Sequence, residues 1–276
     1  MEIDKKRVLW ILEAVLALII IIVAGIWLVH QIGGAREDKA MLSKMEALQD
    51  AKKRGATAGA PRNDAATGTD SRILPDYTEI YQLNDDMIGW LTIEDTVIDY
   101  PVMQTPENED YYIDKDFFNE KNKNGSLIMD TDSRVGTGTL AADYKDGTVP
   151  GTNLIIHGHT MQSGNMFGDL QSYKKEDYGL NHSRICFDSI YEKREYELIS
   201  AFYSQVFYED EDVFKFYDFF QADTEDEFNE WYGNIKELAL YDTGATAEYG
   251  DEFITLTCCS YQVEDGRFVV VGKRIK

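Results

Sequence analysis

The longest apolar run of the chain lies near its N-terminus. Residues 8–29 are apolar apart from Glu13. Folded as an α-helix, a run of this length crosses a hydrocarbon layer of about 30 Å. The pattern therefore predicts a transmembrane anchor over residues 8–30.

The charges beside this run indicate its orientation. A Lys-Lys-Arg cluster precedes it, and basic residues next to a membrane segment favour the cytoplasmic side. We therefore expect residues 1–7 in the cytoplasm and everything after His30 outside the cell membrane. A cleavable signal peptide is the alternative, but the run exceeds a usual signal-peptide core and no small-x-small cleavage site follows it.

Residues 31–72 have the composition of a tether. Residues 35–54 are rich in helix-forming residues and predict a helical stalk. Residues 55–72 are small and polar, which is typical of a flexible linker. The folded domain is therefore expected to cover residues 73–276.

Short strand-like runs separated by turn residues dominate this domain, a pattern typical of a β-barrel or β-sandwich. The predicted strands are 88–93, 97–104, 126–129, 153–157, 195–203, 253–257 and 268–272. Residues 130–150 are rich in Gly, Thr and Asp and predict a long surface loop.

Helices are expected to be peripheral, and the clearest begins at Thr224. The Thr224 hydroxyl can cap the first turn while Glu227 reaches back to it. The apolar side chains that follow recur on one helical face: Phe228, Trp231, Tyr232, Ile235 and Leu238. This pattern predicts a helix that packs on the β domain.

Composition narrows the function classes. The chain has 50 acidic and 27 basic residues and a net charge of −23, which repels phosphate backbones and argues against binding nucleic acid. Its three cysteines, Cys186, Cys258 and Cys259, are too few for a disulfide framework. At least one free thiol is therefore expected in a domain outside the cytoplasm.

Three groups at strand ends could do chemistry: His157 and His159, Cys258 and Cys259, and Arg267. A thiol becomes an effective nucleophile when a histidine shares its proton, and the imidazolium can then protonate a departing amine. A nearby guanidinium can donate hydrogen bonds to the oxyanion of the intermediate. Together these residue types suit acyl transfer from a peptide.

Each group also has a structural interpretation. Cys186 is expected to be an apolar packing residue, and side-chain alternation along a strand predicts that only one of Cys258 and Cys259 faces a cleft. Two histidines and two cysteines could also suggest zinc, but adjacent cysteine side chains diverge and zinc needs converging ligands. We therefore expect no metal and no cofactor.

The segment ITLTCCSYQVEDGRFVVVGKR resembles the nucleophile strand of sortases, whose signature is Thr-Leu-x-Thr-Cys followed by an arginine. The resemblance places Cys259 on the catalytic cysteine, Arg267 on the catalytic arginine, and Thr257 on the variable position, where it is expected to shape the substrate cleft. Cys258 replaces the second threonine of the signature.

A second segment, NLIIHGHTMQSGNMFGDL, resembles the histidine segment of the same family, usually an apolar strand followed by Tyr-Gly-His. It places His159 on the catalytic histidine, and His157 replaces the usual tyrosine. Two further segments, NDDMIGWLTIEDTVIDYPVMQ and YYIDKDFF with NGSLIMD, are similar to the N-terminal half of class B sortases. The resemblance implies a mainly β fold, a closed sortase barrel with peripheral helices behind an N-terminal transmembrane helix.

The resemblance also implies a function. The enzyme would cleave a C-terminal sorting motif of secreted proteins through a thioacyl-enzyme and pass the acyl group to an amine. The implied partners are the sorted proteins, the membrane, and an acceptor such as a lipid-linked cell-wall precursor or a pilin lysine. Two alternatives remain from the residues themselves: a cysteine protease that uses water as acceptor, and a non-catalytic surface-binding module.

Overall fold

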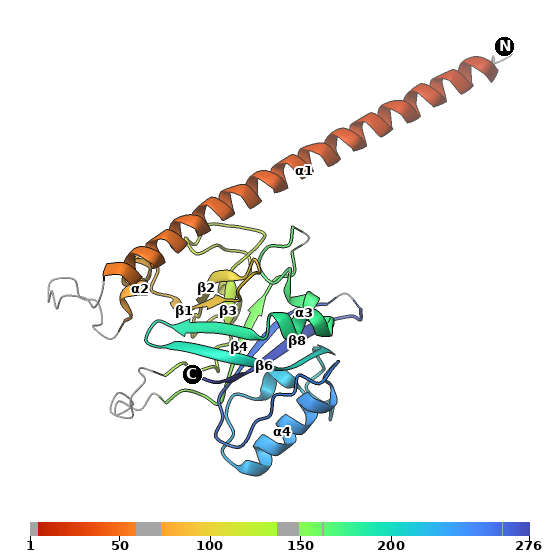
Figure 1. The fold of residues 1–276 in the computed structure, drawn as a ribbon. Coiled ribbons are helices and arrows are strands. Elements are labelled where there is room, and N and C mark those ends of the chain that lie inside the picture. Colours follow the sequence, from red (N-terminus) through yellow and green to blue (C-terminus); the bar gives the residue numbers. More distant parts are fainter. Residues whose placement is uncertain (1–4, 59–72, 137–148, 162, 261) are drawn as a thin grey trace. The chain divides into compact units, whose positions relative to one another are not determined.

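The computed structural model describes residues 5–58, 73–136, 149–161, 163–260 and 262–276 (Figure 1). The chain divides into two compact units, Met1–Glu46 and Ala47–Lys276. In its described part the first unit is helical and belongs to α1 (Lys5–Ala58).

Four predictions concern the N-terminal region and the long loop. Within the described residues, no helix is both long and apolar enough to span a membrane, so the structure does not confirm the anchor expected at 8–30. The predicted linker lies mostly outside the described residues, at 59–72, and so does the centre of the predicted loop, at 137–148. The predicted stalk is helical, and the boundary between the two units falls within it.

The second unit is a closed barrel with the strand order β1-β2-β3-β4-β7-β8-β6-β5 (Figure 1). Neighbouring strands are antiparallel except for the pairs β2·β3 and β4·β7, which are parallel. The strands are β1 (Met87–Thr92), β2 (Asp99–Met103), β3 (Leu127–Met129), β4 (Asn153–Gly158), β5 (Arg184–Ser189), β6 (Lys193–Gln205), β7 (Phe253–Cys259) and β8 (Gly266–Arg274). The expected closed β-barrel is therefore confirmed.

Seven of these strands overlap the sequence-based runs, and β5 is the exception. It is six residues long, and its buried Ile185 and Phe187 alternate with more exposed neighbours. Only these two large apolar residues mark it, so the sequence pattern was too weak to predict a strand. It nevertheless pairs with both β1 and β6 and thereby closes the barrel.

The barrel unit also contains short helices. They are α2 (Pro75–Tyr81), α3 (Glu176–Asn181) and the 3-10 helices η1 (Glu109–Tyr112), η3 (Leu170–Lys174) and η4 (Phe216–Asp218). The last turns of α1 also belong to the barrel unit, where Leu48 and Ala51 are buried and Gln49 Nε2 donates a hydrogen bond to Asp99 O at 3.1 Å.

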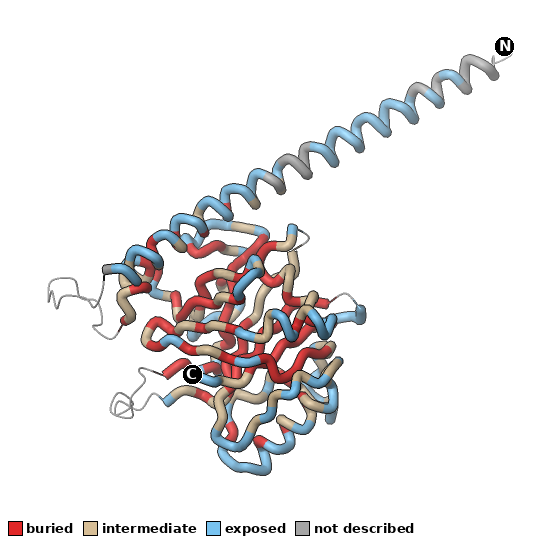
Figure 2. The backbone as a smooth tube through the Cα atoms, in the orientation of Figure 1, coloured by how far each residue is buried: buried red, intermediate tan, exposed pale blue. Residues whose placement is uncertain are grey.

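The predicted capped helix is confirmed as α4 (Glu225–Glu237). The Thr224 hydroxyl accepts from the Glu227 backbone N–H while the Glu227 carboxylate accepts from the Thr224 N–H, which forms the expected capping box. Its apolar face lies in one buried cluster with residues of β6, β7 and β8, including Phe202 and Phe253. In Figure 2 the buried positions concentrate in the barrel strands, whereas much of α4 is exposed on its other side.

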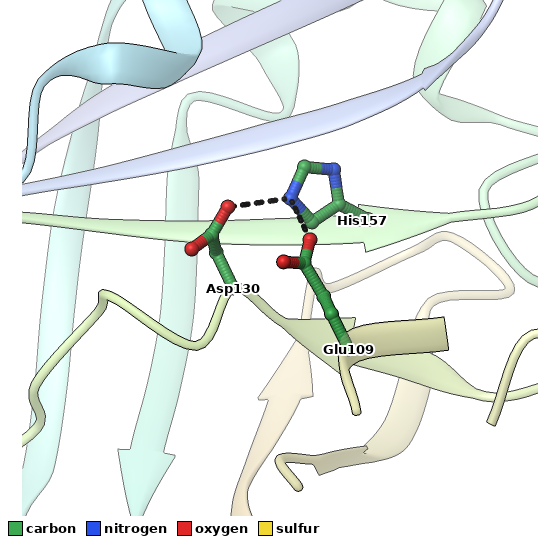
Figure 3. A group of neighbouring side chains, drawn as sticks. All are labelled: Glu109, Asp130 and His157. Atoms are coloured by element: carbon green, nitrogen blue, oxygen red, sulfur yellow. Dashed lines mark hydrogen bonds and ion pairs between the residues drawn. The ribbon is translucent and has the colours of Figure 1, made fainter. Parts of the chain in front are cut away.

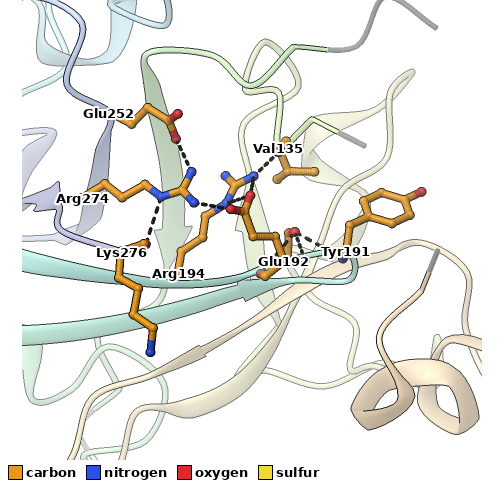
Figure 4. A network of polar contacts seen from close by, with 8 residues as sticks. Val135, Tyr191, Glu192, Arg194, Glu252, Arg274 and Lys276 are labelled. Carbon is orange, nitrogen blue, oxygen red and sulfur yellow. Dashed lines mark hydrogen bonds and ion pairs between the residues drawn. The ribbon is translucent and has the colours of Figure 1, made fainter. Parts of the chain in front are cut away.

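A charged network joins the starts of β6 and β7 to the end of β8 (Figure 4). The Glu192 carboxylate accepts hydrogen bonds from Arg194 and from Arg274, and Arg274 also pairs with Glu252 at 2.7 Å. Arg194 is 1% exposed and donates further to the backbone carbonyl of Val135. Buried charges are tolerated only when paired in this way.

Candidate active site

Strand register places the predicted site residues side by side. The parallel pair β4·β7 sets His157 beside Thr257, and the antiparallel pair β7·β8 sets Cys259 opposite Arg267. Side chains of paired residues lie on the same face of a sheet, and alternate residues share that face. Thr257, Cys259 and Arg267 are therefore on one face, whereas Cys258 lies on the other.

This face borders a cavity of about 260 Å³. The structure brings all four predicted site residues together on it: His159, Cys259, Arg267 and Thr257. The other lining residues are Glu109, Asp110, Ile113, Ser126, Ile128, His157 and Gly158. A larger cavity, of about 510 Å³, is bordered by the ends of β6 and α4 and contains none of the predicted residues.

The two adjacent cysteines have different surroundings. Cys258 is 2% exposed and does not line the cavity, and burial raises the pKa of its thiol to about 12. Cys259 is half-buried and lines the cavity. Both thiols and Cys186 are free, and the sequence had indicated at least one free thiol. Because Cys258 stays a protonated thiol at neutral pH, Cys259 is the cysteine suited to nucleophilic attack.

His159 follows β4 directly and is held by a backbone contact. Its Nε2 lies 2.7 Å from the carbonyl oxygen of Ile113, at the end of η1. A carbonyl can only accept, so Nε2 carries a hydrogen and Nδ1 is the ring nitrogen that can exchange a proton with a substrate. Gly125 makes room for the ring, because a Cβ there would lie 3.0 Å from His159 Cδ2 and 2.4 Å from Ile113 O.

Arg267 is anchored at the start of β8. Its Nη1 donates to the carbonyl oxygens of Asp265 at 3.2 Å and Gly266 at 3.1 Å. The guanidinium still has donors on Nε and Nη2 for a developing negative charge.

Two side chains hold the end of β7. Thr160 Oγ1 and Gln171 Nε2 each donate a hydrogen bond of 2.9 Å to the backbone carbonyl oxygen of Cys259. The nucleophile strand is thus fixed at the residue that carries the thiol. Neither Thr160 nor Gln171 was predicted from the sequence. Both residues position the backbone of Cys259, and this role does not depend on a recognisable sequence motif.

Two acidic residues of the site were also missed. Glu109, at the start of η1, and Asp130, directly after β3, approach the ring of His157 from two sides (Figure 3). His157 Nε2 lies 3.3 Å from Asp130 Oδ2 and 3.6 Å from Glu109 Oε1. Asp130 ends an apolar run and could have been noted for that reason, whereas Glu109 lies in a polar segment with no such signal.

A free thiol, an imidazole and a guanidinium around one cavity at the end of a closed barrel are the functional groups of a cysteine acyl-transfer enzyme. No family model matches the chain. Sortase B of Listeria monocytogenes is 30% identical to it over 220 residues, which cover 78% of this chain and 80% of the relative. Sortase B of Staphylococcus aureus is 26% identical over 206 residues, or 74% of this chain and 76% of the relative. The chain belongs to the class B sortase family and is a cysteine transpeptidase.

Solved structures agree with this assignment. A crystal structure of sortase B from Bacillus anthracis superposes with a TM-score of 0.66 at 25% identity, covering 85% of this chain and 97% of that one. Sortase B from Listeria monocytogenes superposes with a TM-score of 0.56 at 30% identity, covering 71% and 98%. A substrate complex of Staphylococcus aureus sortase B, at 23% identity and a TM-score of 0.69, covers 87% and 99% and shares the fold.

Proposed function

We propose that Cys259, His159 and Arg267 are the catalytic residues of this transpeptidase and that it acts on C-terminal sorting motifs of secreted proteins. The observation that carries the assignment is the shared cavity, to which three separate strand ends contribute one functional group each.

In the first half-reaction the Cys259 thiolate attacks a backbone carbonyl carbon of the sorting motif. The carbonyl oxygen takes up the negative charge, which Arg267 stabilises with guanidinium hydrogen bonds. When the C–N bond breaks, a proton from Nδ1 of His159 passes to the leaving amine. A thioester between substrate and Cys259 remains.

In the second half-reaction an amine attacks the thioester carbonyl, a new amide forms, and the thiolate of Cys259 leaves. The amine loses its proton to Nδ1 of His159, which restores the starting state. The acceptor would be a cell-wall precursor or a pilin lysine. A crystal structure of a sortase B complexed with triglycine supports a peptide amine at this step.

Thr257 is proposed to contact the substrate beside the thiol. It lines the cavity and is 2% exposed, and its Oγ1 has no hydrogen-bond partner among the described residues. A buried hydroxyl without a partner is unfavourable, so a substrate amide or a water that enters the cavity gains a hydrogen bond there.

Residues 8–30 are proposed to hold the enzyme at the outer surface of the cell membrane. The length and apolar character of this run support an anchor, and the preceding basic cluster supports a cytoplasmic N-terminus. Within this run the described large apolar side chains of α1 are exposed, among them Trp10 at 75% and Ile21 at 67%. Confinement of enzyme, sorted protein and acceptor to one surface would raise their encounter frequency.

Fractionation tests the anchor. In cells that produce the full chain, we expect it in the membrane fraction and released by detergent but not by high salt or carbonate. A variant that lacks residues 1–30 is expected in the soluble fraction. Recovery of the full chain without detergent would contradict the anchor.

A peptide assay tests the reaction. We expect the full chain in detergent micelles to join peptides that carry a threonine-containing sorting motif to triglycine, with the ligated product detected by mass spectrometry. A protease would give the same hydrolysed peptide whether or not triglycine is present. A binding module would leave the peptide uncleaved with or without triglycine. Hydrolysis that ignores triglycine and the absence of any cleavage would each contradict transpeptidation.

A further inference from the structure

One cluster of side chains beside the cavity has no part in the proposed mechanism. It consists of Glu109, Asp130 and His157, which come from η1, from the residue after β3, and from β4 (Figure 3). One potential ligand atom from each residue lies within 4.8 Å of the other two. The three side chains therefore converge on one point, although no sequence motif links them.

The distances in this cluster are longer than those of charge-assisted hydrogen bonds. Such bonds between an imidazolium and a carboxylate measure about 2.7–2.9 Å. Here Nε2 of His157 lies 3.3 Å from Asp130 and 3.6 Å from Glu109. Zinc ligands at about 2.0–2.2 Å from a tetrahedral ion lie about 3.3–3.6 Å from one another. The two distances from His157 Nε2 fall in this range, and the third pair, Glu109 with Asp130, lies within 4.8 Å.

The Asp130 carboxylate is oriented by its neighbours. Its Oδ1 accepts a hydrogen bond of 3.0 Å from the backbone N–H of Asp132. Its own backbone carbonyl accepts from Gln104 Nε2 at 2.8 Å, and its N–H donates to Ile155 O at 3.0 Å. These bonds fix the residue and leave Oδ2 directed at His157. Residues that do not bind the metal themselves commonly orient a metal ligand through hydrogen bonds of this kind.

The cluster opens onto a cavity that can hold a further polar ligand. Glu109 and His157 line this cavity, and so does Thr257, the strand partner of His157. The Thr257 hydroxyl is buried and has no hydrogen-bond partner among the described residues.

The charge of the cluster also favours a cation. Two of its three groups, Glu109 and Asp130, are carboxylates whose potential ligand atoms lie within 4.8 Å of each other. Asp110 and Asp132 add further negative charge around Glu109. A divalent cation between the carboxylates would relieve this repulsion.

We propose that Glu109, Asp130 and His157 form a divalent-cation site in the wall of the catalytic cavity, with zinc the best match to one nitrogen and two oxygen ligands. Three protein ligands and an open fourth position are the arrangement of an accessible zinc site. None of the three ligands is one of the proposed catalytic residues, although Glu109 and His157 line the same cavity as Cys259 and His159. The ligands belong to distant segments, which explains why the sequence indicated no metal.

Zinc titration tests this site. The full chain in detergent micelles would carry Cys259→Ala, so that zinc cannot bind the thiol that lines the cavity. Isothermal titration calorimetry is expected to show one zinc ion per chain. Glu109→Gln, Asp130→Asn and His157→Tyr are each expected to weaken binding at least about tenfold, because each removes a ligand. The matched control is Glu107→Gln, an exposed carboxylate of the same loop, which should leave binding unchanged.

Two results would overturn the proposal. The first is the absence of saturable one-to-one binding in the Cys259→Ala chain. The second is a zinc affinity in all three ligand variants that is unchanged from that of the Cys259→Ala chain, which would place the zinc elsewhere. Circular dichroism checks that each variant is folded. If Asp130→Asn does not fold, the result for Glu109→Gln decides the test, because the Glu109 side chain is 43% exposed and its replacement disturbs the fold less. Tighter binding of calcium than of zinc would overturn the choice of metal.

Discussion

Replacement of Cys259 by alanine is expected to abolish the thioacyl-enzyme, whereas Cys258→Ala is expected to retain it. Cys259 lines the catalytic cavity opposite Arg267, while Cys258 is buried on the other face of β7 with its thiol pKa raised to about 12 by burial. Removal of a catalytic nucleophile lowers the turnover number by several orders of magnitude. Cys258→Ala should instead reduce mainly the stability of the barrel, because it deletes one buried sulfur.

Mass spectrometry of the enzyme mixed with a sorting-motif peptide measures the acyl adduct directly. Iodoacetamide provides a second measure, because it reacts with thiolates and should label Cys259 well before Cys258 at neutral pH. Cys186→Ala is the control, since this third thiol is outside the cavity. An adduct that persists in Cys259→Ala and disappears in Cys258→Ala would reverse the assignment.

Replacement of Glu192 by leucine is expected to destabilise the barrel by about 3–5 kcal/mol. Its carboxylate receives hydrogen bonds from Arg194 and Arg274, and the Arg194 side chain is 1% exposed. Without Glu192 the Arg194 guanidinium stays buried with no opposite charge, and a buried unpaired charge is strongly unfavourable. Catalytic residues are not touched, so the loss should appear in the free energy of unfolding.

Urea unfolding of the full chain, followed by tryptophan fluorescence, measures this loss. Glu195→Gln is a matched control, because Glu195 pairs with Arg184 and Lys276 at an exposed position where solvent screens the charges. We expect a much smaller change for the control. Equal unfolding midpoints for Glu192→Leu and Glu195→Gln would show that the buried network is not a major source of stability.

Local patterns were sufficient for much of the fold. The capping box at Thr224 and the apolar face of α4 depend on neighbours within one helix, and the structure confirms both except at Leu238. Leu238 follows the last residue of α4 and is 41% exposed. Strong β patterns likewise predicted seven of the eight strands. The strand β5 was missed because six residues with two large apolar side chains give little signal, and it is held by pairing with β1 and β6.

The same division between local patterns and long-range contacts explains why only part of the candidate site could be predicted from the sequence. Cys259, His159 and Arg267 carry reactive groups in recognisable segments, so they could be named before their positions were known. Thr160 and Gln171, which hold the backbone of Cys259, have ordinary side chains in segments without a motif. Their role depends on a contact across the fold and therefore leaves no local pattern.

The sequence by itself determined which groups are capable of acyl transfer, because nucleophilicity and proton exchange belong to the side chains of cysteine and histidine. The resemblance to sortases also favoured Cys259 over Cys258, and only the tertiary structure supplies a physical reason for that choice. The pairing of β7 with β4 and β8 turns Cys259 to the cavity and Cys258 to the interior, and burial then keeps the Cys258 proton in place. The same packing places Glu109 and Asp130 beside His157. This proximity depends on segments that are distant in the sequence, so no local pattern encodes it.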